Sequence, residues 1–261
     1  YLMKPYTSFK FAMERAKRYL AWYSVLHDTR VRNARKEWAD GFRDLMHWSA
    51  TEPILRIDSE GAEGILVLRG SKMTDRKDFQ HEYLSELLRS AIVAAVSSLD
   101  RYMHDMVVES AWGLLGQAEA RIPKSLKELP IQALDAKRAI EKLRKDPNAR
   151  PGNTIKAAIQ RVLHEDTFQG PGGIEKAINM LGINNFWAQV VAILPGSPKV
   201  EDVKKKLNEL VRRRNFIVHE ADTIRKIRAK KTTLRDITYT ETKEQIEWLE
   251  QLVAAINQIL P

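Results

Sequence analysis

The stretch LSELLRSAIVAAVSSLDRYMHDM, residues 84–106, decides the class of fold. Its apolar residues recur at three- and four-residue steps and form a wide face, made of Leu84, Leu87, Leu88, Ala91, Ile92, Ala95, Val96, Leu99, Tyr102, Met103 and Met106. This spacing is the period of an α-helix, and a helix with so wide an apolar face is normally central to a bundle. We therefore expect a long helix over residues 75–112 in a mostly α-helical protein.

The flanking sequence extends this expectation in both directions. Residues 7–49 have helical periodicity, with a break near residues 27–29, and further helices are predicted over 132–146, 153–165, 174–181, 184–194, 199–222 and 241–259. Residues 53–70 differ, because two short β-type runs flank a Gly-containing turn, which predicts a small β-hairpin. We divide the chain into an N-terminal helical arm with this hairpin, residues 1–70, and a helical domain, residues 71–261.

Composition limits the classes of function. The net charge is +9 and the pI about 9.6, a balance that favours a polyanion such as nucleic acid or an anionic membrane without choosing between them. The chain has no cysteine, which excludes disulfides and thiol catalysis. No apolar run approaches the roughly 18 residues of a membrane span, and the first residues are no signal peptide. We expect a cytoplasmic protein with no membrane partner, no metal and no cofactor, since neither metal-ligand spacing nor a nucleotide-binding motif occurs.

The segment VRRRNFIVHEAD, residues 211–222, carries the candidate chemistry. Placed on a helix, Arg214 falls inside an apolar stripe, while Asn215, His219 and Asp222 form a polar line beside it. Burying an unpaired guanidinium costs several kcal/mol, so Arg214 needs a partner. Either it pairs with a carboxylate of the central helix, with Asp100 and Asp105 as candidates, or the stripe borders a cleft that receives an anion.

Arg214, Asn215 and His219 together suit phosphodiester chemistry without a metal. The histidine can move a proton near neutral pH, and the arginine can stabilise the charge of a phosphorane-like transition state. The asparagine can hold the scissile phosphate or the histidine, and Asp222 would support the set. RNA brings its own nucleophile, the 2′-hydroxyl, so the expected products carry 2′,3′-cyclic phosphate and 5′-hydroxyl ends.

Basic residues surround this segment. Arg212 and Arg213 point away from the apolar stripe, as a solvated face or as charges that steer phosphate. Other candidates for RNA contact lie in the basic runs before and after the segment: Lys204, Lys205, Arg225 and Arg228. Two similar spacings, Arg76 with His81 and Arg43 with His47, are set aside because their neighbours lack the apolar filling or the length.

The run from Arg214 to His219 resembles the signature of the HEPN superfamily, an arginine, a polar residue, a few apolar residues and a histidine near the end of a helix. Asp222 and the stretches 97–102 and 167–183 resemble the RiboL-PSP-HEPN branch, so that the likeness covers residues 75–222. The resemblance implies a helical bundle acting as a homodimer, with Arg214 and His219 as the catalytic pair and Asn215 beside them. It also implies a toxin or antiviral-defence role, with an antitoxin or defence-complex partner as a further expectation.

Two other functions remain open on the sequence. The protein could be a non-catalytic RNA-binding or scaffolding HEPN module within a larger complex. It could also be a helical interaction protein, such as an antitoxin or a complex subunit, in which Arg214 makes a structural ion pair. The three hypotheses differ in whether RNA is cleaved, only bound, or ignored.

Overall fold

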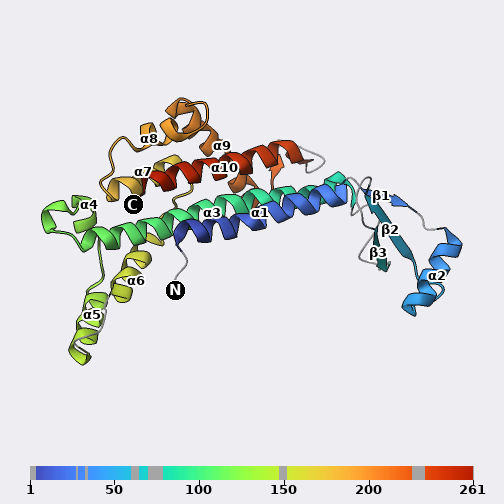
Figure 1. Cartoon of the computed structure of the whole chain (residues 1–261), viewed down its shortest axis with the longest axis horizontal. Helices are drawn as coiled ribbons and strands as arrows, with labels where there is room; N and C mark the ends of the chain where they lie inside the picture. The colour runs from blue at the N-terminus through green and yellow to red at the C-terminus, as the bar shows by residue number, and fades with distance from the viewer. Residues whose placement is uncertain are drawn as a thin grey trace.

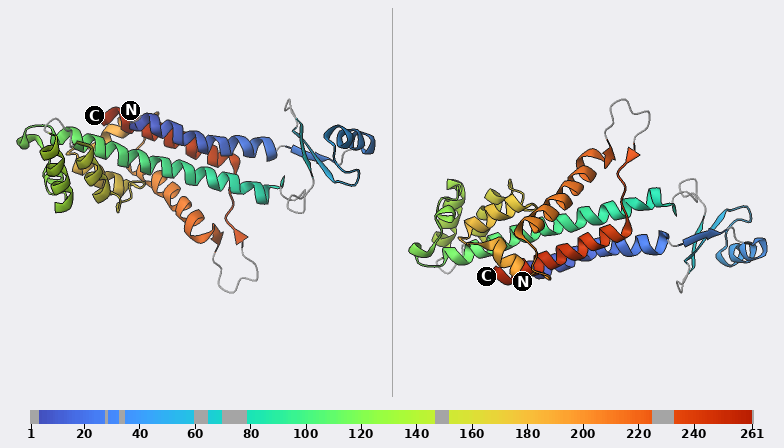
Figure 2. Two further views of the ribbon diagram at one scale, coloured as in Figure 1. Left: turned by 90° about the horizontal axis from the view of Figure 1, so that it is seen from below. Right: turned by 90° about the horizontal axis from the view of Figure 1, so that it is seen from above.

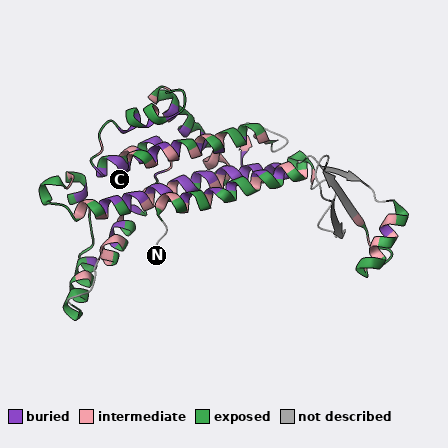
Figure 3. Cartoon of the chain, in the orientation of Figure 1, coloured by how far each residue is buried: buried purple, intermediate pink, exposed green. Residues whose placement is uncertain are grey.

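The computed structural model of the chain describes residues 4–27, 29–32, 35–59, 65–69, 79–146, 152–224 and 233–260. Helix α3, His81–Leu115, runs along the centre of a helical bundle, with buried residues along its length (Figures 1 and 3). The predicted central helix is therefore confirmed, although the expected start at residue 75 lies outside the described residues. The mostly α-helical fold expected from the sequence is also confirmed.

Two long helices pack beside α3. Helix α1, Pro5–His27, and helix α10, Tyr239–Ile259, lie along it (Figure 2). The apolar residues of α1 that recur at helical spacing are all buried against this core: Phe9, Met13, Ala16, Leu20 and Tyr23. The N-terminal helix thus shares one core with α3 and α10.

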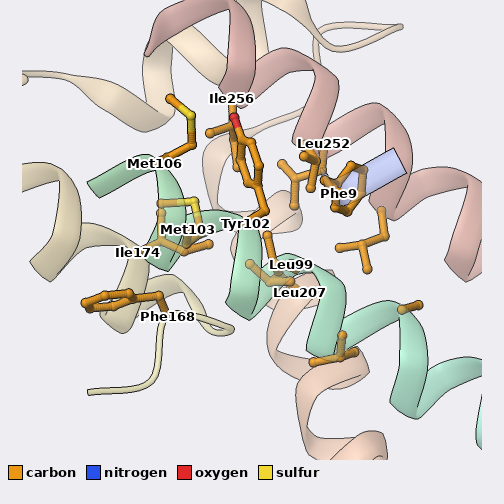
Figure 4. Close-up of a cluster of buried hydrophobic side chains, with 14 of the residues drawn as sticks. Phe9, Leu99, Tyr102, Met103, Met106, Phe168, Ile174, Leu207, Leu252 and Ile256 are labelled. Atoms are coloured by element: carbon orange, nitrogen blue, oxygen red, sulfur yellow. The ribbon is translucent and has the colours of Figure 1, made fainter. Parts of the chain in front are cut away.

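Tyr102 lies where these three helices meet (Figure 4). Tyr102 is 1% exposed, and its ring packs at a tilt of 59° against the ring of Phe9, with ring centroids 5.7 Å apart. Its hydroxyl donates a hydrogen bond to Asn257 Oδ1 of α10 at 3.2 Å, and burial raises the pKa of this phenol above its ordinary value.

The remaining helices cover the other sides of α3. Their bounds are Lys124–Lys127 for α4, Ala133–Lys145 for α5, Gly152–Leu163 for α6, Pro171–Met180 for α7, Phe186–Ile193 for α8 and Val200–Glu220 for α9. Five of these and α10 match predicted helices, whereas α4 and a short 3₁₀ helix at Glu119–Arg121 were not predicted. Helix α5 extends away from the bundle and is held to α6 by the ion pair of Asp135 with Arg161 (Figure 1).

A small antiparallel sheet lies beyond one end of α1 and α3 (Figure 1). Strands β2, Ile54–Ser59, and β3, Ile65–Arg69, form the predicted hairpin, with Arg56 opposite Val67. Strand β1, Thr29–Arg32, adds a third strand beside β2, and α2, Lys36–Met46, connects the two. The break expected near residues 27–29 is confirmed, but the strand that follows it was missed.

Two further strands, β4 at Thr223–Ile224 and β5 at Thr233–Leu234, pair antiparallel between α9 and α10. They bring the chain back past the end of α9 before α10 begins. Over the part of the chain that is described, no helix is long and apolar enough to cross a membrane. The division of the chain at residue 70 stays a prediction.

Candidate functional site

Helix α9 carries the segment singled out in the sequence. Leu207 and Leu210 are buried in the core shared with α3, and this fixes which face of the helix turns inward. Glu201 and Asp202 occupy the first turn, where negative charge favours the helix dipole. The first part of α9 is therefore fixed in the core, and its C-terminal turns hold Arg214, Asn215 and His219.

Asp222 does not continue the polar line of α9, so that expectation was wrong. The helix ends at Glu220, and Ala221 and Asp222 both have left-handed backbone, with φ of 47° and 54°. The Asp222 N–H closes the turn by donating to the Phe216 carbonyl at 2.9 Å. This turn carries the Asp222 side chain inward, where it is fully buried.

Two arginines share the buried carboxylate. Arg89 Nε of α3 and Arg213 Nη2 of α9 each donate to Asp222 Oδ2 at 2.8 Å. Arg89 Nη2 also donates to the Arg235 carbonyl at 2.9 Å, and Arg213 Nη2 to the Asp236 carbonyl at 2.9 Å. The network joins α3, the end of α9 and the segment that leads into α10, so Asp222 connects the end of α9 to the rest of the bundle.

Arg213 therefore differs from its expected solvated position. Its side chain is 19% exposed and paired with Asp222. Burial lowers the pKa of its guanidinium below the ordinary value, while the Asp222 carboxylate opposes that shift. Arg213 acts as a structural partner, because its Nη2 donates to Asp222 and to the backbone carbonyls of residues 235 and 236.

Arg214 is placed differently. Its Nη1 donates to Asn215 Oδ1 at 3.1 Å, and its Nε–H is buried without a hydrogen-bond partner among the described residues. The two expected carboxylates are engaged elsewhere. Asp100 Oδ1 accepts the Phe168 N–H at 2.6 Å, and Asp105 Oδ2 accepts Arg101 Nε at 2.9 Å.

In the described part of the chain no carboxylate pairs with Arg214. Of the two alternatives that the sequence left open, the structural ion pair is thus not seen there. A guanidinium that is half-buried and unpaired is suited to an anion that arrives from outside.

His219 lies in the last turn of α9 and is exposed. Asn215 lies one helical turn before it, so Asn215 is adjacent to both Arg214 and His219 on the helix surface. Val218 beside them is 46% exposed, which makes the end of the predicted apolar stripe a surface feature. Around the axis of α9, Arg214 and His219 lie about 140° apart, with Asn215 between them.

The expected RNA-contacting residues occupy varied surroundings. Arg212 is exposed and lies over the Phe216 ring at 5.3 Å from its centroid. Lys204 is paired with Glu175, and Lys205 is exposed. Arg225 and Arg228 lie outside the described residues.

The set-aside histidine, His81, accepts or donates in a bond of 2.7 Å between its Nδ1 and the Tyr23 hydroxyl. Arg76, its partner in the sequence pattern, lies outside the described residues. Among the residues that the structure describes, no three histidine, aspartate or glutamate side chains gather as a metal site.

Sequence reasoning missed Arg89, which is 4% exposed and makes the longest-range contact of the network. The signal was its position in the apolar run of the central helix, next to Leu88 and two residues before Ala91. A cation inside so apolar a face requires a buried counter-ion. Asp222 supplies that counter-ion from 133 residues further along the chain.

The comparison with known families gives a match that spans most of the chain. The profile of the RiboL-PSP-HEPN family matches residues 70–261. The chain belongs to this family. The matched region includes the whole of α3, α9 and α10, whereas α1 and the three-stranded sheet lie outside it.

Neither the search of curated proteins nor the search of solved structures found a match. Membership of a HEPN family indicates an RNase or an RNA-binding module.

Proposed function

We propose that this RiboL-PSP-HEPN protein is a metal-independent endoribonuclease. The observation that carries the proposal is the state of Arg214, which has no carboxylate partner among the described residues and a buried Nε–H without an acceptor. A phosphate oxygen would satisfy that donor and pair with the guanidinium. His219, exposed and five residues further along α9, can exchange a proton with solvent and substrate.

The roles follow from the chemistry of each group. Arg214 stabilises the negative charge that develops on the scissile phosphate, and Asn215 orients Arg214 through its Oδ1. His219 moves a proton to or from the 2′-hydroxyl or the leaving 5′-oxygen. Attack by the 2′-oxygen on phosphorus breaks the bond to the 5′-oxygen, so the products are a 2′,3′-cyclic phosphate and a 5′-hydroxyl.

A single chain supplies one such motif. We propose a homodimer in which two α9 ends border one cleft, because the exposed Val218 beside His219 offers an apolar contact for a second copy. Cleavage of cellular RNA would make the protein a toxin or an effector of antiviral defence. Induction in a host cell should then arrest growth for the wild type and not for His219→Ala.

The nuclease proposal is tested by incubating purified protein with labelled RNA in excess EDTA. Cleavage by the wild type, absent from Arg214→Ala and His219→Ala, supports it. His164→Ala is the matched control, since His164 is also exposed at the end of a helix and lies outside the motif. If the wild type binds RNA without cleaving it, the non-catalytic module is the better description.

A further inference from the structure

A groove is lined by helices α1 and α3 and reaches the motif helix. Its volume is about 470 Å³, and Ile217 of α9 forms part of its wall. Ile217 lies three residues after Arg214, so the two side chains are neighbours on the surface of α9 and the groove adjoins Arg214. In both views of Figure 2, α3 lies between α1 and α9.

Small side chains make the hollow. Where α1 and α3 face each other, the lining includes Ala12 on one side and Ser90, Ala94 and Ser97 on the other. Larger residues at these positions would fill the space between the helices. Ser97 is exposed, and its hydroxyl can donate to a phosphate or accept from a ribose hydroxyl.

The charges in the groove favour an anion. Arg15 of α1 is exposed and has no carboxylate partner within the described ranges. Arg101 of α3 has a side chain 71% exposed, and among the described residues its one partner is Asp105, which accepts from its Nε. Its two terminal amino groups remain for a ligand.

One carboxylate, Glu86, is also part of the lining. It lies 3.1 Å from Nη1 of the buried Arg89, so its charge is offset within the wall of the groove. Arg15, the terminal groups of Arg101 and this partly offset carboxylate are therefore the charges that a ligand in the groove would meet. Tyr19 adds an aromatic ring between them and the sheet end of α1, and such a ring can stack on a nucleobase.

We infer that this groove binds the single-stranded RNA next to the scissile phosphate, an inference that rests on the proposed RNA-directed function. Arg15 and Arg101 bind consecutive phosphates of the backbone, and Tyr19 stacks on a base. A single strand suits the groove because it can present both phosphates and an unpaired base. Helix α1 lies outside the family match, so the N-terminal arm would add a substrate-binding wall to the family domain.

The test measures binding separately from cleavage. His219→Ala protein is titrated with a fluorescein-labelled oligoribonucleotide of mixed sequence, and Arg15→Glu is added to that background. We expect about tenfold weaker binding at about 0.15 M salt, and a salt dependence reduced by about one counterion. Arg18→Glu is the matched control, because Arg18 is exposed on the same helix three residues away and does not line the groove.

The outcomes separate the two proposals. Weaker binding by Arg15→Glu and unchanged binding by Arg18→Glu support the groove, whether or not the wild type cleaves RNA. Equal effects of the two substitutions, or none, overturn the groove while leaving a nuclease result intact. Analytical ultracentrifugation of the same proteins tests whether the groove is instead part of a dimer interface. If Arg15→Glu changes the oligomeric state, the groove is a contact between copies and the inference fails.

Discussion

Substitution of Asp222 by asparagine removes one buried charge and leaves the shape of the side chain. Asparagine also tolerates the left-handed backbone that Asp222 adopts, so the change isolates electrostatics. Arg89 and Arg213 would then share a neutral amide where they now share a carboxylate at 2.8 Å. Removing one charge of a buried ion pair lowers the unfolding free energy by about 3–5 kcal/mol. Because the amide keeps an oxygen acceptor, we expect a loss of about 3 kcal/mol.

Urea unfolding followed by circular dichroism measures this loss. A decrease of about 3 kcal/mol corresponds to a fall in Tm of about 6–12 °C for a chain of this size. Asp236→Asn is the control, because Asp236 is exposed and contributes to the network through its backbone carbonyl; it should stay within about 0.5 kcal/mol of the wild type.

Partner substitution adds a second check on the same reasoning. Arg89→Met combined with Asp222→Asn should cost less than the sum of the two single changes, by about 1–3 kcal/mol, because the two residues are in direct contact. An Asp222→Asn protein as stable as the Asp236→Asn control would refute the view that this carboxylate holds the end of α9.

Two further predictions concern the rest of the fold. A Cβ on Gly173 would lie 2.1 Å from the Thr167 carbonyl oxygen, whereas one on Gly172 would meet nothing within 4 Å. Gly173→Ala should therefore lower the unfolding free energy by about 1–3 kcal/mol. Equal stability of the Gly172→Ala and Gly173→Ala proteins in urea would contradict this packing. Hydrogen bonding to Arg161 lowers the pKa of the Asp135 carboxyl below its ordinary 3.8, so the pair stabilises α5 against α6 above that pH and the contribution is lost as pH falls through the lowered pKa. Hydrogen exchange of α5 amides at about pH 7 should be slower in the wild type than in Asp135→Asn, and this difference should decrease as pH falls through the lowered pKa of Asp135. The prediction is wrong if the two proteins exchange alike at neutral pH.

The sequence was most informative where one periodicity governed many residues. The apolar face from Leu84 to Met106 identified the central helix, and the apolar spacing of α1 identified the residues it buries. Both helices bury a continuous face in one core, so local pattern and tertiary packing agree. Strand β1 was not predicted, because its four residues, Thr29–Arg32, are too few to show an alternating pattern.

The end of α9 could not be predicted for a different reason. Left-handed residues that end a helix are usually glycine, but here Ala221 and Asp222 adopt that backbone. Their conformation is held by contacts with Arg89 and Arg213, which depend on the whole fold. For the same reason the sequence indicated Asp222 as a supporting residue but could not predict its contacts with Arg89 and Arg213.

The sequence predicted which residues make up the candidate site, but not which partners surround them. The pattern predicted that Arg214 would either have a carboxylate partner or border an anion site, and only the packing of α9 could distinguish these. Asp100 and Asp105, both plausible partners by helix position, are engaged by the Phe168 N–H and by Arg101. That Arg214 has no carboxylate partner among the described residues is thus a consequence of tertiary contacts.

The most direct test of the nuclease account uses the nucleophile that it assigns to RNA. An oligoribonucleotide is cleaved in EDTA, the site is mapped, and the nucleotide that supplies the 2′-hydroxyl there is replaced by its 2′-deoxy form. The account predicts that cleavage at that bond is lost while binding is retained, and that the unmodified RNA gives 2′,3′-cyclic phosphate and 5′-hydroxyl ends. Continued cleavage at the 2′-deoxy position, or products with 5′-phosphate ends, would contradict it.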